Sequence, residues 1–275
     1  MAKVWFVTGS SRGLGLALVE AILASGDTAV ATARKADSLN HLVEKYSSDR
    51  VLAVPLDVTN NDQVLAAVDA AVKAFGRIDV VVNNAGYADI ASIEDISLES
   101  FRGQIETLFF GVVHVTRAVL PTMRKQGSGH IIQVSSIGGR VATPGLAAYQ
   151  SAKWAVGGFS TSLSQEVAPF GIKVTVLEPG GMHTDMGLSL MQPVAMSEGY
   201  EQTVGALLKA VEQSEKTWSP TAGIANIIVE ISKVDDPPLR LLAGADTVEA
   251  AKRASEVLAA TDEKWRDLTL SPSRS

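Results

Sequence analysis

Residues 4–15 of the chain read VWFVTGSSRGLG. The first part, Val4–Thr8, is an apolar, β-branched run that predicts a buried strand, and the helix-like segment Leu14–Ala24 follows almost at once. Gly9, Gly13 and Gly15 lie at this junction, where glycine lets the backbone turn tightly and approach a bound pyrophosphate. The amides and the dipole at the start of the helix would meet the negative charge of that pyrophosphate.

The glycine spacing in this turn is G-x-x-x-G-x-G, which differs from the general dinucleotide fingerprint G-x-G-x-x-G. A glycine cluster also fits an ordinary tight turn that binds nothing. The position of the cluster at the first strand–helix junction favours phosphate binding, because dinucleotides bind at this junction in parallel α/β sheets.

Beyond the turn, short apolar runs alternate with longer segments of helical periodicity. The expected strands are Val4–Thr8, Thr28–Thr32, Val51–Leu56, Asp79–Val82, His130–Val134, Lys173–Leu177 and Leu239–Leu242. The expected helices are Leu14–Ala24, Asp62–Phe75, Leu98–Lys125, Tyr149–Val167 and Thr247–Asp267. Most of these strands are continuously apolar, which is typical of strands covered on both faces. The pattern predicts an α/β protein with a doubly wound, mostly parallel seven-stranded sheet and helices on both faces, the Rossmann fold.

No linker rich in Pro or Ser divides the first part of the chain, so we expect residues 1–275 to form one dinucleotide-binding domain. The weakest periodicity lies in Met182–Tyr200, which is rich in Met, Gly, Ser and Pro and is interpreted as a loop with at most one short helix. A helical extension is expected at about 246–268, after the last strand.

The composition excludes several classes of protein. Lys and Arg number 24 against 30 Asp and Glu, a net charge of −6 that disfavours binding to nucleic acid, which needs a basic surface. The chain has no cysteine, so thiolate catalysis and cysteine-ligated metals are excluded, and its four histidines share no ligand spacing with acids. We expect no metal site. No apolar run approaches the roughly 20 residues that span a bilayer, and the apolar run at the N-terminus is short for a secretory signal, so we expect a cytoplasmic protein without a membrane partner.

The end of the second expected strand bears on the choice of nucleotide. Proteins that bind NAD place an acidic residue there for the ribose hydroxyls, whereas this strand ends Ala31-Thr32-Ala33-Arg34-Lys35. Arg34, together with Arg12 in the glycine turn, would pair with a 2′-phosphate. The sequence therefore favours NADP(H) over NAD(H), although two basic residues at a strand end are also typical of an ordinary solvated surface.

Further motifs follow the glycine turn in a fixed order. They are Asp57 after the third strand, Asn83-Asn84-Ala85-Gly86 after the fourth, Ser135-Ser136 after the fifth, Tyr149-x-x-x-Lys153, and Pro179-Gly180 after the sixth. In this combination the chain resembles the short-chain dehydrogenase/reductase family, in its single-domain branch. The resemblance implies an oxidoreductase that transfers hydride between a nicotinamide and a carbonyl or alcohol, and a substrate-binding loop at about 182–206.

The residues support that chemistry. Tyr149 and Lys153 are one helical turn apart, so their side chains share a face, and a nearby ammonium is expected to lower the pKa of the phenol. Tyr149 would then exchange a proton with the substrate oxygen. Ser136 would hydrogen-bond that oxygen as charge develops on it. Ser135 is the adjacent alternative, and the family spacing selects Ser136.

The resemblance also assigns cofactor contacts. The expected residues are Gly9, Ser11, Arg12, Gly13, Leu14 and Gly15 around the pyrophosphate, Arg34 at the 2′-phosphate, Asp57 and Val58 at the adenine, Asn84, Ala85 and Gly86 along the ribose side, and Tyr149, Lys153, Pro179, Gly180 and Thr184 around the nicotinamide. The helices Leu98–Lys125 and Tyr149–Val167 pair subunits in relatives, which implies a homodimer or homotetramer.

One position departs from the family. Leu108 stands where relatives usually carry an Asn that helps to hold a proton-relay water, and a leucine side chain has no hydrogen-bonding group. This departure leaves open the alternative that the chain is a regulatory protein of the same fold, which binds the cofactor but catalyses only weakly. An epimerase or dehydratase is a further alternative, because these also use Tyr-x-x-x-Lys. Their usual first turn, T-G-x-x-G-x-x-G, and their longer C-terminal domain are not seen here.

Overall fold

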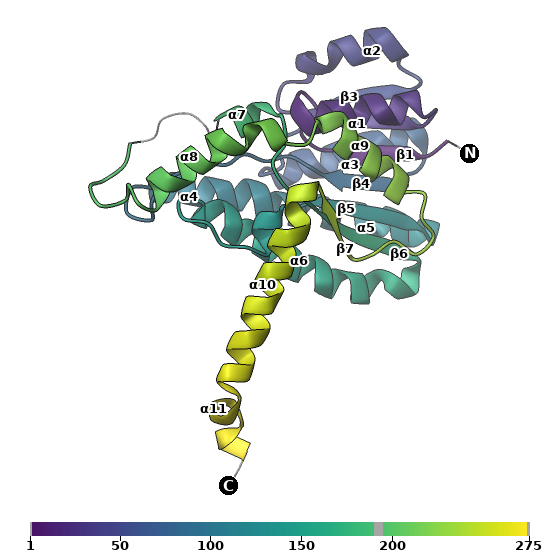
Figure 1. Ribbon diagram of the computed structural model, residues 1–275. Helices are drawn as coiled ribbons and strands as arrows, with labels where there is room; N and C mark the ends of the chain where they lie inside the picture. Colours follow the sequence, from purple (N-terminus) through teal and green to yellow (C-terminus); the bar gives the residue numbers. More distant parts are fainter. Residues whose placement is uncertain (1, 190–194, 274–275) are drawn as a thin grey trace.

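The computed structural model describes residues 2–189 and 195–273. Its centre is one parallel sheet of seven strands in the order β3-β2-β1-β4-β5-β6-β7, surrounded by helices (Figure 1). The strands are β1 (Val4–Val7), β2 (Thr28–Ala33), β3 (Val51–Pro55), β4 (Val80–Asn83), β5 (Gly129–Val134), β6 (Ile172–Pro179) and β7 (Arg240–Ala243). Every pairing between neighbouring strands is parallel. The predicted doubly wound Rossmann fold in a single domain is confirmed.

Alternate residues of each strand enter two separate cores, one on each face of the sheet. Trp5 and Val7 pack with apolar residues of α1 (Gly13–Ala24), α2 (Asn40–Tyr46) and α9 (Thr221–Ile231). Val4 and Phe6 pack on the opposite face with residues of α3 (Asn61–Phe75), α5 (Gly111–Gln126) and α6 (Ala147–Val167). Because both faces are covered, the strands are apolar throughout rather than alternating.

The boundaries of the elements differ from the prediction by one or two residues in most cases. The largest difference concerns the expected helix Leu98–Lys125, which is divided into α4 (Leu98–Ile105), a π-helical turn (Glu106–Phe110) and α5. The sequence pattern gave no prediction for α2, α8 (Val204–Ser214) or α9. α9 is short and rich in β-branched residues, a composition that does not distinguish a buried helix from a strand.

Two segments project from the sheet. The expected loop at 182–206 contains α7 (Asp185–Ser189) and leads into α8, while its residues 190–194 lie outside the described residues. The C-terminal helix α10 (Ala245–Lys264) and the short α11 (Arg266–Leu270) extend away from the body of the molecule (Figure 1). None of the described helices is both long and apolar enough to cross a membrane.

Candidate active site

The carboxyl ends of the strands open into one cavity of about 790 Å³. Its walls include residues predicted from the sequence at both ends of a dinucleotide site: Gly9, Ser11, Arg12, Gly13, Leu14, Arg34, Asp57, Val58, Asn84, Ala85, Gly86, Tyr149, Lys153 and Thr184. The predicted residues Gly15, Ser136, Pro179 and Gly180 are not part of this wall. The sequence motifs, scattered over most of the chain, therefore meet at one edge of the sheet.

The glycine turn is built for close approach. Gly9 has a φ of +70°, and a side chain there would bring its Cβ to 2.9 Å from the Cα of Ala85. A Cβ on Gly15 would overlap the carbonyl oxygen of Gly9, so Gly15 acts in packing beneath the turn rather than in the cavity wall. Asn84 fixes the turn from the neighbouring strand, because its Nδ2 donates to the carbonyl oxygens of Thr8 (2.9 Å) and Gly9 (3.2 Å).

The start of α1 fits an anion. The N-cap residue Arg12 makes no side-chain capping hydrogen bond, and no acidic residue lies in the first turn of the helix. The first amides of a helix have no intrahelical acceptor, so a phosphate at this position would receive their hydrogen bonds. The residues present therefore fit the pyrophosphate of a dinucleotide.

The two basic residues predicted for the 2′-phosphate differ in their surroundings. Arg34 lies exposed just beyond the end of β2 and lines the cavity. Arg12 lies across from Asp185, the first residue of α7, with Nη1 3.6 Å from the carboxylate, and both side chains are largely exposed. This ion pair, which the sequence did not suggest, joins the glycine turn to the expected substrate loop.

Tyr149 and Lys153 lie one turn apart on α6, as the spacing predicts. The Lys153 Nζ is 5.5 Å from the centroid of the Tyr149 ring and donates to the carbonyl oxygen of Val134 at 2.7 Å. Lys153 is only 6% exposed, and this burial lowers its pKa from 10.5 to about 8. The ammonium is thus held between the cavity and the end of β5.

The predicted lowering of the Tyr149 pKa is wrong for this structure. Burial raises the pKa of the phenol above its ordinary value of 10, and the neighbouring Ser136 hydroxyl offsets only part of this rise. The charge of Lys153 alone would favour the tyrosinate, but the loss of water around the phenol disfavours it and decides the direction of the shift.

The two serines after β5 have different partners. Ser135 is buried, lines the cavity, and its hydroxyl lies 3.4 Å from the carbonyl oxygen of Lys153. Ser136 caps the 3₁₀ turn Ile137–Gly139, accepts from the amide of Gly138 at 3.0 Å, and donates to the carbonyl oxygen of Pro179 at 3.4 Å. Ser136 is the one whose hydroxyl interacts with the Tyr149 phenol.

The segment after β6 is held by the end of β7 and by the start of the C-terminal helix. The amide of Gly180 donates to the carbonyl oxygen of Ala243 at 3.1 Å, and the amide of Gly181 donates to Asp246 Oδ2 at 3.0 Å. A side chain at Gly180 would overlap the Asp246 carboxylate. Asp246 is not among the residues predicted from the sequence, because no local signal marks it and its partner lies 65 residues earlier in the chain.

Leu108 lies in the π-helical turn and is 1% exposed. It lines the cavity opposite Gly86, where a Cβ would approach Leu108 Cδ2 to 2.6 Å. π-helical turns occur mostly as single interruptions of α-helices near functional sites. Leu108 therefore contributes only apolar atoms to this part of the cavity wall.

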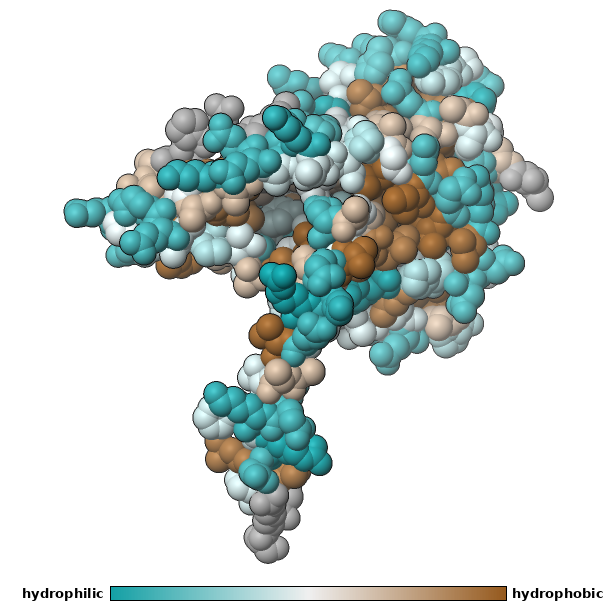
Figure 2. Space-filling view, viewed as in Figure 1, coloured by the Kyte–Doolittle hydropathy of each residue, from teal (hydrophilic) through white to brown (hydrophobic). Residues whose placement is uncertain are grey.

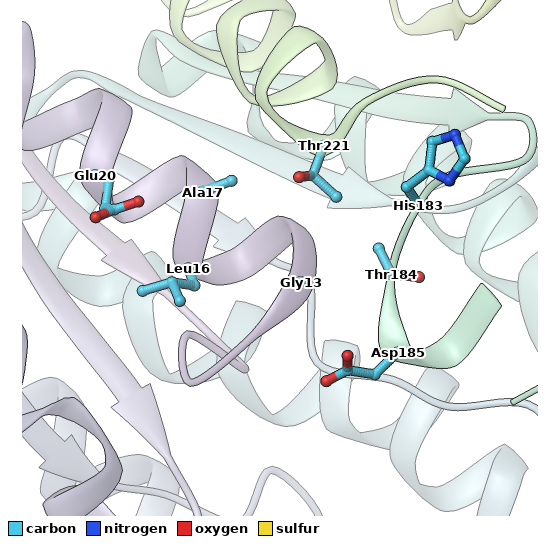
Figure 3. Close-up of a pocket in the computed structure, with 8 residues that line it drawn as sticks. All are labelled: Gly13, Leu16, Ala17, Glu20, His183, Thr184, Asp185 and Thr221. Atoms are coloured by element: carbon cyan, nitrogen blue, oxygen red, sulfur yellow. The ribbon is translucent and has the colours of Figure 1, made fainter. Parts of the chain in front are cut away.

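A second cavity, of about 390 Å³, lies beside α1 (Figure 3). It is lined by Gly13, Leu16, Ala17 and Glu20 of α1, by His183, Thr184 and Asp185, and by Thr221 at the start of α9. Gly13, Thr184 and Asp185 belong to the walls of both cavities. Among the residues that the structure describes, no group of three or more metal ligands lies together.

Known proteins resemble the chain along its length. The family described as short chain dehydrogenase matches residues 3–194. Oxidoreductase BOA17 of Botryotinia fuckeliana is 58% identical over 98% of this chain and 99% of that protein. A short-chain dehydrogenase from Streptomyces avermitilis shares 36% identity and a TM-score of 0.88, covering 98% of this chain and 97% of that one. A short-chain dehydrogenase from Burkholderia cenocepacia, solved in complex with NADP, shares 26% identity and a TM-score of 0.75, covering 96% and 97%. Taken with the glycine turn and the Tyr149–Lys153 pair in one cavity, these matches show that the chain is an oxidoreductase that belongs to the short-chain dehydrogenase family.

Proposed function

We propose that the protein is an NADP(H)-dependent carbonyl reductase or secondary-alcohol dehydrogenase. The observation that carries the proposal is that one cavity is lined both by the glycine turn and by Tyr149 and Lys153. A dinucleotide bound along this cavity would bring its reactive end to Tyr149 and Lys153. Among the described residues that line the cavity, these are the only two that combine a phenol with a buried ammonium.

The chain's own residues supply the proton chemistry. NADP(H), when bound, gives or takes the hydride. Tyr149 donates a proton to the oxygen of a ketone or aldehyde, or removes one from an alcohol. The raised pKa keeps its phenol protonated at neutral pH, which suits reduction. The Lys153 ammonium orients the nicotinamide ribose and the phenol, and the hydroxyl of Ser136 stabilises charge on the substrate oxygen.

The preference for NADP(H) rests on Arg34 and Arg12. Arg34 is exposed at the end of β2 and lines the cavity, so its guanidinium is free to turn towards a 2′-phosphate. Arg12 would exchange its exposed ion pair with Asp185 for the phosphate, and exposed pairs of this kind contribute little to stability. Asp57, Val58, Asn84, Ala85 and Gly86 would complete the adenosine side, and Pro179, Gly180 and Thr184 the nicotinamide side.

We further propose a cytoplasmic homodimer or homotetramer whose partners are small carbonyl or alcohol molecules, with residues 182–206 as the substrate-binding loop. The helices expected to pair subunits carry exposed apolar side chains, namely Leu98 (71% exposed), Phe110 (41%) and Trp154 (47%). The net charge of −6 supports the absence of a nucleic-acid partner.

The test follows the absorbance of NADPH, which should be consumed with ketones and aldehydes and formed from NADP⁺ with alcohols, and NAD(H) is assayed in parallel. Tyr149→Phe should lower turnover by a factor of roughly 100 to 10,000, because the proton donor is lost, while NADPH binding measured by calorimetry is retained. NADPH binding without turnover of any substrate would favour the regulatory alternative. A cofactor returned unchanged alongside an altered sugar nucleotide would favour an epimerase.

Arg34→Asp tests the choice of nucleotide. It should weaken NADP(H) binding far more than NAD(H) binding, because a carboxylate would repel the 2′-phosphate and accept hydrogen bonds from ribose hydroxyls instead. Equal weakening of both nucleotides would contradict the assignment.

A further inference from the structure

The C-terminal arm, defined as α10 and α11, leaves the body of the protein after its first two turns. Thr247 and Ala251 near its root are buried (0% and 4% exposed), and the neighbours of α10 in the body are β7 and the 3₁₀ turn after Ser136. Every residue from 255 to 272 is exposed. Figures 1 and 2 show the arm standing free of the body, with hydrophobic residues along it.

One face of the arm carries an apolar stripe with helical spacing. The stripe consists of Ala251, Ala254, Leu258, Thr261 and Trp265, at alternating intervals of three and four residues, the pattern of the core positions of paired helices. The stripe begins on the face that the root of the arm buries against its own body. Farther from the body the stripe is exposed to solvent, since Leu258 is 57% exposed and Trp265 is 54% exposed.

Physical chemistry disfavours such an arm in isolation. Helices without tertiary contacts are marginal in water below about 15 residues, and in proteins most helical stability comes from packing an apolar face. The chain also exposes more surface than a compact monomer. Its accessible area is 14050 Å², whereas a globular monomer of 28.9 kDa is expected to expose about 11,400 Å². The excess of about 2,700 Å² exceeds the roughly 800 Å² that each partner buries in a standard interface.

We propose that the arms of two copies of this chain pair in antiparallel orientation, the tip of each against the root of the other. A small residue, Ala254, lies near the root of the exposed part of the stripe and a large one, Trp265, lies at its tip, so antiparallel pairing places small opposite large. Ala254 meets the partner's Trp265, and Leu258 meets the partner's Thr261 at the centre. This contact is isologous and closes as a twofold dimer.

The sizes of the side chains along the stripe favour antiparallel over parallel pairing. A parallel pair would set alanine against alanine at the root and tryptophan against tryptophan at the tip, which leaves a void at one end and crowds the other. The arm carries more acids than bases, which disfavours an acidic membrane as its occupant.

The mass of the full-length protein in solution tests the proposal. Light scattering after gel filtration should give a dimer or a higher even-numbered oligomer, and Leu258→Asp and Trp265→Asp should each halve that mass. Leu65→Asp, on α3, changes a leucine that is 50% exposed in the body and should leave the mass unchanged. Turnover of NADPH should be retained in all three, which keeps this test separate from that of the proposed function. A monomeric wild-type protein, or arm variants with unchanged mass, would overturn the proposal.

The chain has no cysteine, so single cysteines report the orientation directly. A mixture of Leu258→Cys and Thr261→Cys protomers should form a disulfide between the two variants on oxidation. Ala254→Cys alone should not cross-link to itself, because antiparallel pairing separates the two copies of that position by about 16 Å along the helix axis. Self-cross-linking of Ala254→Cys would show parallel arms, and arm-dependent flotation of a monomer with lipid vesicles would identify a membrane as the occupant. Either result would overturn the proposal.

Discussion

The amide of Gly181 donates to Asp246 Oδ2 at 3.0 Å, which ties the segment after β6 to the root of the C-terminal arm. The same carboxylate lies against Gly180, where no side chain would fit. This hydrogen bond joins two residues that are 65 positions apart in the chain, and it fixes the backbone on which the proposed nicotinamide site depends.

Asp246→Ala should raise the KM for NADPH about fivefold, because the Gly181 amide loses its charged acceptor and the segment gains freedom. The KM for the carbonyl substrate and the pH profile should change little, since the proposed proton-transfer groups lie elsewhere. Steady-state kinetics with each substrate varied in turn is the measurement. Glu249→Ala, an exposed acid farther along α10, is the matched control, and an equal effect of both variants would remove the special role of Asp246.

The pKa values of Tyr149 and Lys153, the proposed catalytic pair, predict opposite pH profiles for the two directions of reaction. Burial raises the pKa of Tyr149, so its phenol remains a proton donor through neutral pH, and the pKa of Lys153 is lowered to about 8. Carbonyl reduction should therefore be fastest below about pH 8 and fall above it as Lys153 loses its charge. Alcohol oxidation, which needs the tyrosinate, should rise with pH through the same range. Reduction that accelerates steadily from pH 7 to pH 10 would contradict these assignments.

Leu108 allows a test of the prediction that an amide at this position would help proton relay. Leu108→Asn should lower the free energy of unfolding by about 3 kcal/mol, because a buried leucine is replaced by a smaller, polar side chain. If the absence of an amide limits proton relay, turnover per folded molecule should nevertheless increase. Leu108→Ala, which removes the same packing without adding an amide, should not show this increase. Equal turnover in both variants would mean that Leu108 does not limit the reaction.

His130 should make stability depend on pH. It is buried, its Nε2 lies 2.9 Å from Thr175 Oγ1, and Thr175 in turn donates to the carbonyl oxygen of Pro238. Burial, with Lys173 and Lys3 nearby, lowers the His130 pKa from 6.5 to about 4. The unfolded chain therefore binds the proton more readily between pH 6.5 and pH 4, so acid favours unfolding.

The contribution of the neutral His130 side chain to the free energy of unfolding should be complete above pH 6.5 and should be lost as the pH falls to about 4. A shift of this size corresponds to roughly 3 kcal/mol over that interval. Denaturant unfolding of wild-type and His130→Gln protein between pH 4 and pH 7.5 measures the difference. If the free energies of unfolding of the two proteins differ by the same amount at every pH in this range, the histidine does not titrate in this way.

The parallel fold was predictable because its signals are local and repeated. Each strand is an apolar run covered on both faces, and the glycine turn lies directly between β1 and α1. The break in the helix around Leu108 was not predictable in the same way, since residues 106–110 have an ordinary helical pattern and the π-helical turn is a matter of packing. The exposed arm was predicted as a helix, but its projection from the body was not.

By itself, the sequence determined which residue types lie at the carboxyl edge of the sheet and that Tyr149 and Lys153 share one face of a helix, because both follow from chain order and helical period. Only the tertiary structure decided that the phenol is made less acidic rather than more, that Arg12 faces Asp185, and that Asp246 holds Gly181. The physical reason is the same in each case. Burial, desolvation and contacts between distant segments depend on how the elements pack, and no local pattern of residues encodes them.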